Sequence, residues 1–139
     1  MGKTLLSAIA SALTGFFGGW LIYGFILSDF MKNAMVHHEG VYKEPPVIWA
    51  IGLANLSLGF LFAWLYKSMN VTKFTQGFLK GIIIAFLITI WFDSFIFAMM
   101  DMYKSFSGFA VDVLTSTILG ALMGGVAALV LGLGNKKVE

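Results

Sequence analysis

The sequence contains no cysteine and no arginine, only two prolines, and few charged residues, which make up 12% of the chain. Without cysteine it has no disulfide scaffold, no thiolate metal site and no cysteine nucleophile. Its nine basic residues are all lysine, and the net charge is only +2. Nucleic-acid binding therefore has little support, because it requires a clustered basic surface. The shortage of polar residues also argues against a soluble domain.

What the chain has in abundance is apolar sequence, with 59% hydrophobic residues and a mean hydropathy of +0.89. A helix needs about 20 largely apolar residues to cross the hydrocarbon core of a bilayer. Four such stretches run approximately over residues 5–27, 47–66, 78–100 and 109–133. The sequence therefore predicts an all-α integral membrane protein, a single domain over residues 1–139, folded as an antiparallel bundle of four transmembrane helices.

Two features refine this prediction at the N-terminal side. The first apolar run follows Lys3 and is longer than the apolar region of a signal peptide, so we expect it to be retained as an anchor. The connection that follows, residues 28–46, has roughly 19 residues, which is long for a compact domain. It is expected to form a short interfacial helix or loop, with an extended Pro45-Pro46 entry to the second span.

Lysine placement predicts the orientation of the spans. Three lysines, Lys32, Lys43 and Lys104, lie on one side, and six lie on the other: Lys3, Lys67, Lys73, Lys80, Lys136 and Lys137. Because cytoplasmic segments carry the excess of lysine, both termini are expected in the cytoplasm. Aromatic residues near the ends of the spans are interpreted as anchors at the membrane boundary. They are Trp20, Tyr23, Trp49, Trp64, Tyr66 and Tyr103.

Small residues recur at every fourth position in each span, which is typical of helices that pack closely within lipid. The third span has the longest row: Gly77, Gly81, Ala85, Thr89, Asp93, Phe97 and Asp101. The other spans supply Ser7, Ser11, Gly15, Gly19 and Tyr23; Asn55, Gly59 and Ala63; and Asp112, Ser116, Gly120, Gly124, Ala128 and Gly132. These rows predict tight packing, principally at Gly15, Gly19, Gly59, Gly81, Ala85, Gly120, Gly124 and Ala128.

Asp93 is the most informative residue, because it lies within the third span. An aspartate at the centre of a membrane helix costs about 2.5 to 3.5 kcal/mol on the insertion scale, so it should face the bundle or water. Its candidate partners are Asn55, Thr89, Ser94, Tyr23 and Asp112. One interpretation is a neutral acid that is hydrogen-bonded to such groups. The other is a proton- or cation-binding site.

Two further acids were considered beside Asp93. Asp101 lies about 12 Å along the helix from Asp93, too far for the two carboxylates to share one ion unaided. Asp112 can instead favour the N-terminal end of its own helix. The polar-core candidates are therefore Asp93, Asn55, Asp112, Asp101, Tyr23 and Thr89.

The sequence favours neither a metal site nor an enzyme. His37 and His38 are adjacent, so on a helix they point about 100 degrees apart and do not chelate as an i, i+4 pair does. A solvated loop is the favoured interpretation, with metal or copper binding as an alternative involving nearby methionines. Phosphate-loop, nucleophile-elbow and His-Glu-x-x-His motifs are absent from the sequence. We therefore expect no catalytic residue and no cofactor.

Several short motifs together resemble a group of small four-helix bacterial membrane proteins. They are Gly-Gly-Trp-Leu-Ile-Tyr-Gly at 18–24, Asp29-Phe30, Pro45-Pro46 and the glycine-rich last span. The resemblance implies the fold and a bacterial inner membrane, but no catalytic residue, because that group has no established activity. The four-span small multidrug transporters match poorly, since their membrane-embedded acid lies in the first helix and this first span has none.

Two functions follow as hypotheses. The first is a non-enzymatic bundle that acts as an accessory or packing protein, alone, as a homo-oligomer or beside a larger membrane partner. The second is a small proton- or cation-coupled transporter or channel that uses Asp93 in the outer half of the membrane. A polar cavity that reaches Asp93 would favour transport, whereas a dry bundle with Asp93 paired to a neighbouring helix would favour the first hypothesis.

Overall fold

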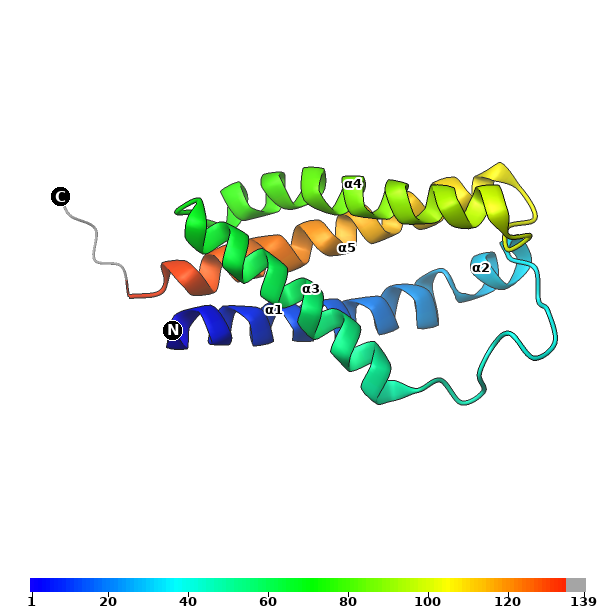
Figure 1. The fold of residues 1–139 in the computed structure, drawn as a ribbon, viewed down its shortest axis with the longest axis horizontal. Coiled ribbons are helices and arrows are strands. Elements are labelled where there is room, and N and C mark those ends of the chain that lie inside the picture. The colour runs from blue at the N-terminus through cyan, green and yellow to red at the C-terminus, as the bar shows by residue number, and fades with distance from the viewer. Residues whose placement is uncertain (135–139) are drawn as a thin grey trace.

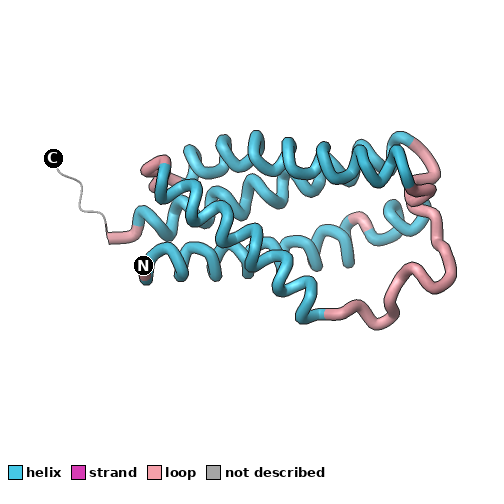
Figure 2. The backbone as a smooth tube through the Cα atoms, in the orientation of Figure 1, coloured by secondary structure: helices cyan, strands magenta, loops and turns pink. Residues whose placement is uncertain are grey.

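The computed structural model describes residues 1–134, and this part of the chain is helical, without a strand (Figure 2). The elements are α1 (Gly2–Leu21), one π-helical turn η1 (Ile22–Ile26), α2 (Ser28–Ala34), α3 (Ile48–Ser68), α4 (Phe74–Met99) and α5 (Phe106–Gly132). The predicted all-α class is confirmed. Lys136 and Lys137, two of the lysines from which the orientation is predicted, lie outside the described residues.

Four of these helices are long and apolar enough to cross a membrane, and they match the four predicted spans to within a few residues. With α1 and η1 counted as one span of 25 residues, the shortest is α3, whose 21 residues correspond to about 32 Å of helix against a hydrocarbon core of about 30 Å. It ends at a tight turn where Asn70 adopts a φ of 53°. That left-handed conformation, which asparagine tolerates well, allows α4 to begin four residues later.

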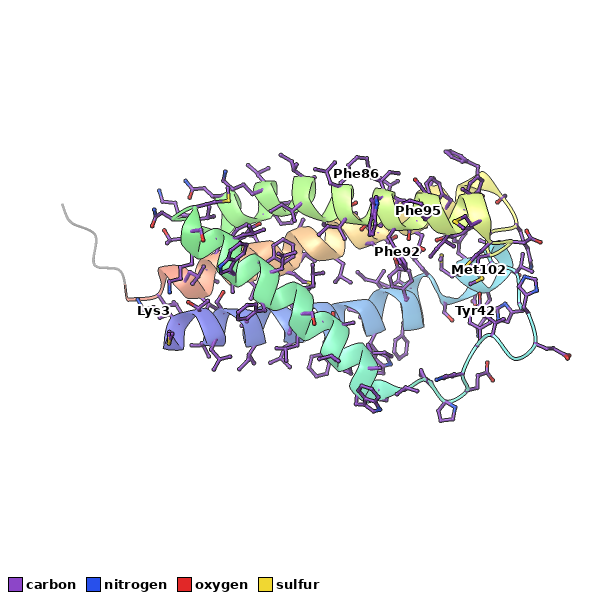
Figure 3. The ribbon with its side chains drawn as sticks, viewed as in Figure 1. Lys3, Tyr42, Phe86, Phe92, Phe95 and Met102 are labelled. Carbon is purple, nitrogen blue, oxygen red and sulfur yellow. The ribbon has the colours of Figure 1, made fainter. Side chains whose placement is uncertain are left out.

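Helix α5 lies at the centre of the arrangement (Figure 1). It packs along α4, and it also contacts α1 and α3, while α1 and α3 pack against each other. Over its most apolar 18 residues, α5 has half of its residues buried, whereas α4 has only 11% buried. Most of α4 therefore presents apolar side chains outward, including the labelled Phe86, Phe92 and Phe95 (Figure 3).

The interface between α4 and α5 is built on the small-residue row predicted for the third span. The four buried residues of α4 are Gly77, Gly81, Ala85 and Asp93, and all four belong to that row. A methyl group added at Gly77 would meet the Ala128 side chain and would lie 2.6 Å from the Gly124 carbonyl oxygen. A methyl group added at Gly120 would likewise meet the Ala85 side chain. The two helices therefore touch through their backbones, as small residues at membrane interfaces permit.

Helix α1 is held against α5 by serine hydroxyls. The Ser7 hydroxyl donates to the Ala127 carbonyl oxygen at 2.8 Å, and the Ser11 hydroxyl donates to the Met123 carbonyl oxygen at 3.0 Å. Both serines are fully buried. Because lipid supplies no competing water, such interhelical bonds stabilise association within a membrane.

The predicted packing glycines of α1 and α3 divide into two groups. Gly59 lies against the Ala8 backbone, and Gly15 lies against Asn55 and the Met123 side chain, so neither leaves room for a larger residue. At Gly19 the nearest atom to an added methyl belongs to the Leu119 side chain, 3.6 Å away. This is ordinary contact, so the close approach of helices stops before Gly19.

Tyr66 corrects one interpretation made from the sequence. It was expected to anchor α3 at the membrane boundary, but its side chain is fully buried. The Tyr66 hydroxyl donates to the Gly77 carbonyl oxygen at 2.6 Å, which ties the end of α3 to the first turn of α4. The tryptophans Trp20, Trp49 and Trp64 are by contrast exposed.

The two ends of the molecule differ. Met1, the turn between α3 and α4 and the end of α5 lie at one end, called here the N-terminal end (Figure 1). The other, the cap end, carries α2 and the connection of residues 100–105. Backbone bonds join these two segments, from Val36 N–H to Met102 O and from Lys104 N–H to Ala34 O, both 2.8 Å. The short helix predicted after the first span is therefore present, and it is tied to the connection between α4 and α5.

Gly77→Ala tests the packing of α4 on α5. Its new methyl group should collide with the α5 backbone, and overpacking of this kind costs about 1–3 kcal/mol. We expect the thermal unfolding midpoint of the protein in detergent micelles to fall. Gly52→Ala is the matched control, because Gly52 also lies near the start of its helix, α3, but has no atom within 4 Å of the added methyl. Equal midpoints for the two variants would contradict backbone contact at Gly77.

Candidate functional site

The polar side chains of the cap half meet at Asp112, in the second turn of α5. Its carboxylate accepts two hydrogen bonds from tyrosines on different segments. The Tyr23 hydroxyl donates to Oδ1 at 2.6 Å, and the Tyr103 hydroxyl donates to Oδ2 at 2.7 Å. Asp112 therefore joins the end of the first span, the connection of residues 100–105 and α5 at one point.

The backbone of the first span departs from regular α-helical geometry at Tyr23. Residues 22–26 form a π-helical turn, closed by the Leu27 N–H donating to the Ile22 carbonyl oxygen at 2.7 Å. Such wide turns occur frequently at functional sites, because they change the direction of a side chain within a helix. The Tyr23 hydroxyl also lies 2.9 Å from the Ser116 hydroxyl, one turn along α5 from Asp112.

Tyr103 lies outside the four long apolar helices but is buried within the cap end. Its ring lies near those of Phe97 and Phe109, with centroid separations of 6.2 and 6.0 Å. Burial raises the pKa of Tyr103 above its usual range, and so do its hydrogen bond to Asp112 and the negative charges of Asp112 and Asp93. Tyr103 is therefore a permanent hydrogen-bond donor to Asp112.

Asp93 is buried on the α5 side of α4, with 6% of its surface exposed. Its Oδ2 atom is buried and has no hydrogen-bond partner among the described residues. Ile90 and Ile96, which share its face of the helix, pack against the cluster of Tyr103, Phe109 and Val113. Asp93 thus faces an apolar interface, within electrostatic range of the Asp112 carboxylate.

Three of the five partners expected for Asp93 lie elsewhere. Ser94 is exposed and, as the next residue along α4, points about 100 degrees away from Asp93. Asn55 and Thr89 line a groove of about 450 Å³ between α3, α4 and α5, together with Ser116. The Asn55 amide donates to the Ile51 carbonyl oxygen of its own helix at 2.9 Å. Within the part of the chain that the structure describes, no side chain is hydrogen-bonded to Asp93 Oδ2, so the expectation of a hydrogen-bonded acid is not met at this atom.

A second groove opens at the cap end and reaches Asp112. Its volume is about 390 Å³, and Asp112 and Tyr23 are among its lining residues. The remaining lining residues come mainly from α2 and the segment after it, and they are Ser28, Met31, Lys32, Met35, His37 and Tyr42. Figure 3 labels Tyr42 at this end of the molecule. Asp93 does not line this groove, so the opening stops at the first of the two carboxylates.

The remaining candidates do not join the cluster. Asp101 is exposed, and its carbonyl oxygen lies 2.9 Å from His38 Nε2, which donates to it. The His37 ring stacks on Tyr42, with centroids 5.2 Å apart. Residues 1–134 contain no group of three or more histidine and acidic side chains that could hold a metal ion.

Two members of the cluster were missed as site residues by sequence reasoning. Ser116 lies one turn from Asp112 in the small-residue row of the fourth span, so its position was a usable signal. Tyr103 was interpreted as a boundary anchor, because nothing local distinguishes a tyrosine that faces lipid headgroups from one that bonds a carboxylate. That distinction depends on how the connection of residues 100–105 folds back over α5.

Comparison with known proteins adds no assignment, since no family model, curated protein or solved structure matches this chain. The chemistry of the cluster must therefore be argued from its geometry. Two carboxylates, one bonded by tyrosines and one with an unpartnered oxygen, are suited to bind a proton or a cation.

Replacing either tyrosine by phenylalanine tests the hydrogen bonds to Asp112. Bonds to a charged group contribute about 1.5–3 kcal/mol, so Tyr23→Phe and Tyr103→Phe should each lower the free energy of unfolding by roughly that amount. Tyr42→Phe is the control, because its hydroxyl makes an exposed 3.3 Å bond to the Val36 carbonyl oxygen. Unfolding in detergent measures all three, and losses in the two test variants no larger than in the control would disprove the arrangement.

Proposed function

We propose that the protein is a multi-pass protein of a bacterial inner membrane, an antiparallel four-helix bundle with both termini in the cytoplasm. The lysine distribution supports the orientation. Lys3 and Lys67 line one cavity of about 410 Å³ at the N-terminal end, and Lys73 lies in the neighbouring turn. Cytoplasmic segments concentrate lysine in this way. The cap end then faces the periplasm.

The function that the geometry supports best is a non-enzymatic accessory role within the membrane. The observation that carries it is the backbone contact of α4 and α5 in the N-terminal half. Gly77 lies against Gly124, and a methyl group added at Gly81 would lie 3.0 Å from the Ala121 Cα. Helices packed so closely leave no room for a solute between them. The uncovered apolar face of α4 is suited to lipid, a second copy or a larger membrane partner.

A second function, proton- or cation-coupled transport, is favoured by one observation. Asp93 is buried with an oxygen that lacks a partner, and ionisable groups within membrane segments commonly mark proton or ion pathways. The groove at the cap end supplies access to Asp112 from one side only. Transport would require the N-terminal half to open, which means separating the α4 and α5 backbones.

The orientation can be tested with single cysteines, because the chain has none of its own. Val41→Cys, at the cap end, should react with a membrane-impermeant maleimide in intact cells whose outer membrane has been made permeable. Met69→Cys, between α3 and α4, should react only after the inner membrane is opened. Both parent side chains are exposed, at 56% and 47%, so accessibility within the protein does not distinguish them. The reverse labelling pattern would invert the topology.

Flux measurements separate the two functions. Purified protein in liposomes should show no proton, sodium or potassium flux above that of empty liposomes if the role is accessory. Asp93→Asn is compared with Asp101→Asn, whose parent residue is exposed at the cap end. Flux that disappears in the first variant and persists in the second would replace the accessory function by coupled transport.

A further inference from the structure

We propose that Asp93 is a proton-binding site that exchanges its proton with the cap end, and that Asp112 is its fixed negative neighbour. This inference goes beyond the accessory function, because a proton site open to one side needs no transport. It would make the protein responsive to pH on the side of the membrane that the cap end faces. Four observations carry it.

The first observation is the unpartnered oxygen of Asp93. A carboxylate that is more than nine-tenths buried normally accepts several hydrogen bonds, yet Asp93 Oδ2 has none within residues 1–134. Its face of α4 packs on Phe109 and Val113 instead. A negative charge on Oδ2 in that setting would have neither water nor a donor, whereas a neutral acid requires much less compensation.

The second observation is the state of Asp112. Both of its oxygens accept tyrosine hydroxyls, so the Asp112 carboxylate has the hydrogen-bond donors that Asp93 Oδ2 lacks. The titratable groups near Asp93 are Asp112 from α5, Tyr23 from η1 and Tyr103 from the connection after α4. Lys32 and His37 line the groove that leads to Asp112. The fixed charge of Asp112 then favours a neutral Asp93, since two like charges at short range repel each other.

The third observation concerns the identity of the ligand. Hard metal cations such as Ca²⁺ and Mg²⁺ take about six or more oxygen ligands. Here both Asp112 oxygens are already engaged by hydroxyls, and apolar side chains surround Asp93. A proton needs no coordination shell, because it binds to one carboxylate oxygen as a covalent O–H. The chemistry therefore favours a proton over a metal cation.

The fourth observation is the one-sided access. Asp112 lines the groove at the cap end, and it is the charged group within electrostatic range of Asp93. Toward the N-terminal end, Ala85, Gly81 and Gly77 of the same helix face lie directly against α5. Protons consequently enter and leave past Asp112. Tyr103 links this event to the cap, because the backbone around it bonds to the segment after α2.

Infrared spectroscopy of the protein in lipid tests the site directly, since a protonated carboxyl group has its own C=O stretching band. The chain has only seven aspartates and glutamates, which keeps the spectrum interpretable. As the pH is lowered from alkaline to mildly acidic, we expect a protonated-carboxyl band to appear in the wild type, to be lost in Asp93→Asn and to be retained in Asp101→Asn. Absence of this band from the wild type, or its persistence in Asp93→Asn, would overturn the proposal.

A pH titration of the same band tests the role of Asp112 and the identity of the ligand. Asp112→Asn removes the negative neighbour, so the titration midpoint of Asp93 should move to lower pH. An unchanged midpoint would refute the pairing. Replacing sodium by a bulky organic cation should leave the wild-type midpoint unchanged, and a shift would mean that an alkali ion competes for the site.

The infrared experiment also separates this inference from the accessory function. The band reports protonation in a single protein molecule, whether or not any ion crosses the membrane. Because asparagine resembles the neutral acid in shape, Asp93→Asn should unfold at a temperature equal to or above that of the wild type. A markedly lower midpoint would show that the ionised form of Asp93 stabilises the fold, which contradicts the proposal.

Discussion

The contact of the α5 backbone with its neighbours is the constraint on which the rest of the structure depends. Glycine and alanine at every fourth position let α4 lie directly against α5, while the Ser7 and Ser11 hydroxyls bond α1 to α5 carbonyl oxygens. In lipid, apolar side chains gain nothing by leaving their surroundings, so close packing and interhelical hydrogen bonds must hold the helices together. Small residues make both possible, because they bring backbone atoms within reach of each other.

This constraint also determines where polar chemistry is possible. In the N-terminal half the α4 and α5 backbones touch, and a side chain larger than a methyl group has no place between them. In the cap half the same rows contain Asp93, Asp112 and Ser116 in place of glycine, so the interface holds functional groups instead. Tyr23 and Tyr103 satisfy one carboxylate and leave the other without a donor at Oδ2. The two acids therefore differ in hydrogen bonding: both Asp112 oxygens accept a hydroxyl, whereas Asp93 Oδ2 accepts none.

Much of the architecture could be predicted because membrane helices must satisfy their own backbone hydrogen bonds, which makes length and hydropathy sufficient to locate them. The small-residue row of the third span likewise predicted the face of α4 that is buried, since positions four apart share one side of a helix. Two assignments went wrong for a different reason. Tyr66 and Tyr103 are amphipathic residues near helix ends, and a pattern along one helix cannot distinguish the headgroup boundary from a polar acceptor on another helix.

The sequence by itself determined the helical class, the four apolar spans and the faces on which they pack, because these depend on local periodicity and composition. Only the tertiary structure decided that α5 is central, that Asn55 and Thr89 line a groove apart from Asp93, and that Asp112 takes both tyrosine hydroxyls. These features depend on which helices meet and at what height along their axes. The role of a tyrosine or a carboxylate depends on the partner that helix packing places beside it. Tyr23 and Asp112, for example, are 89 residues apart in the chain.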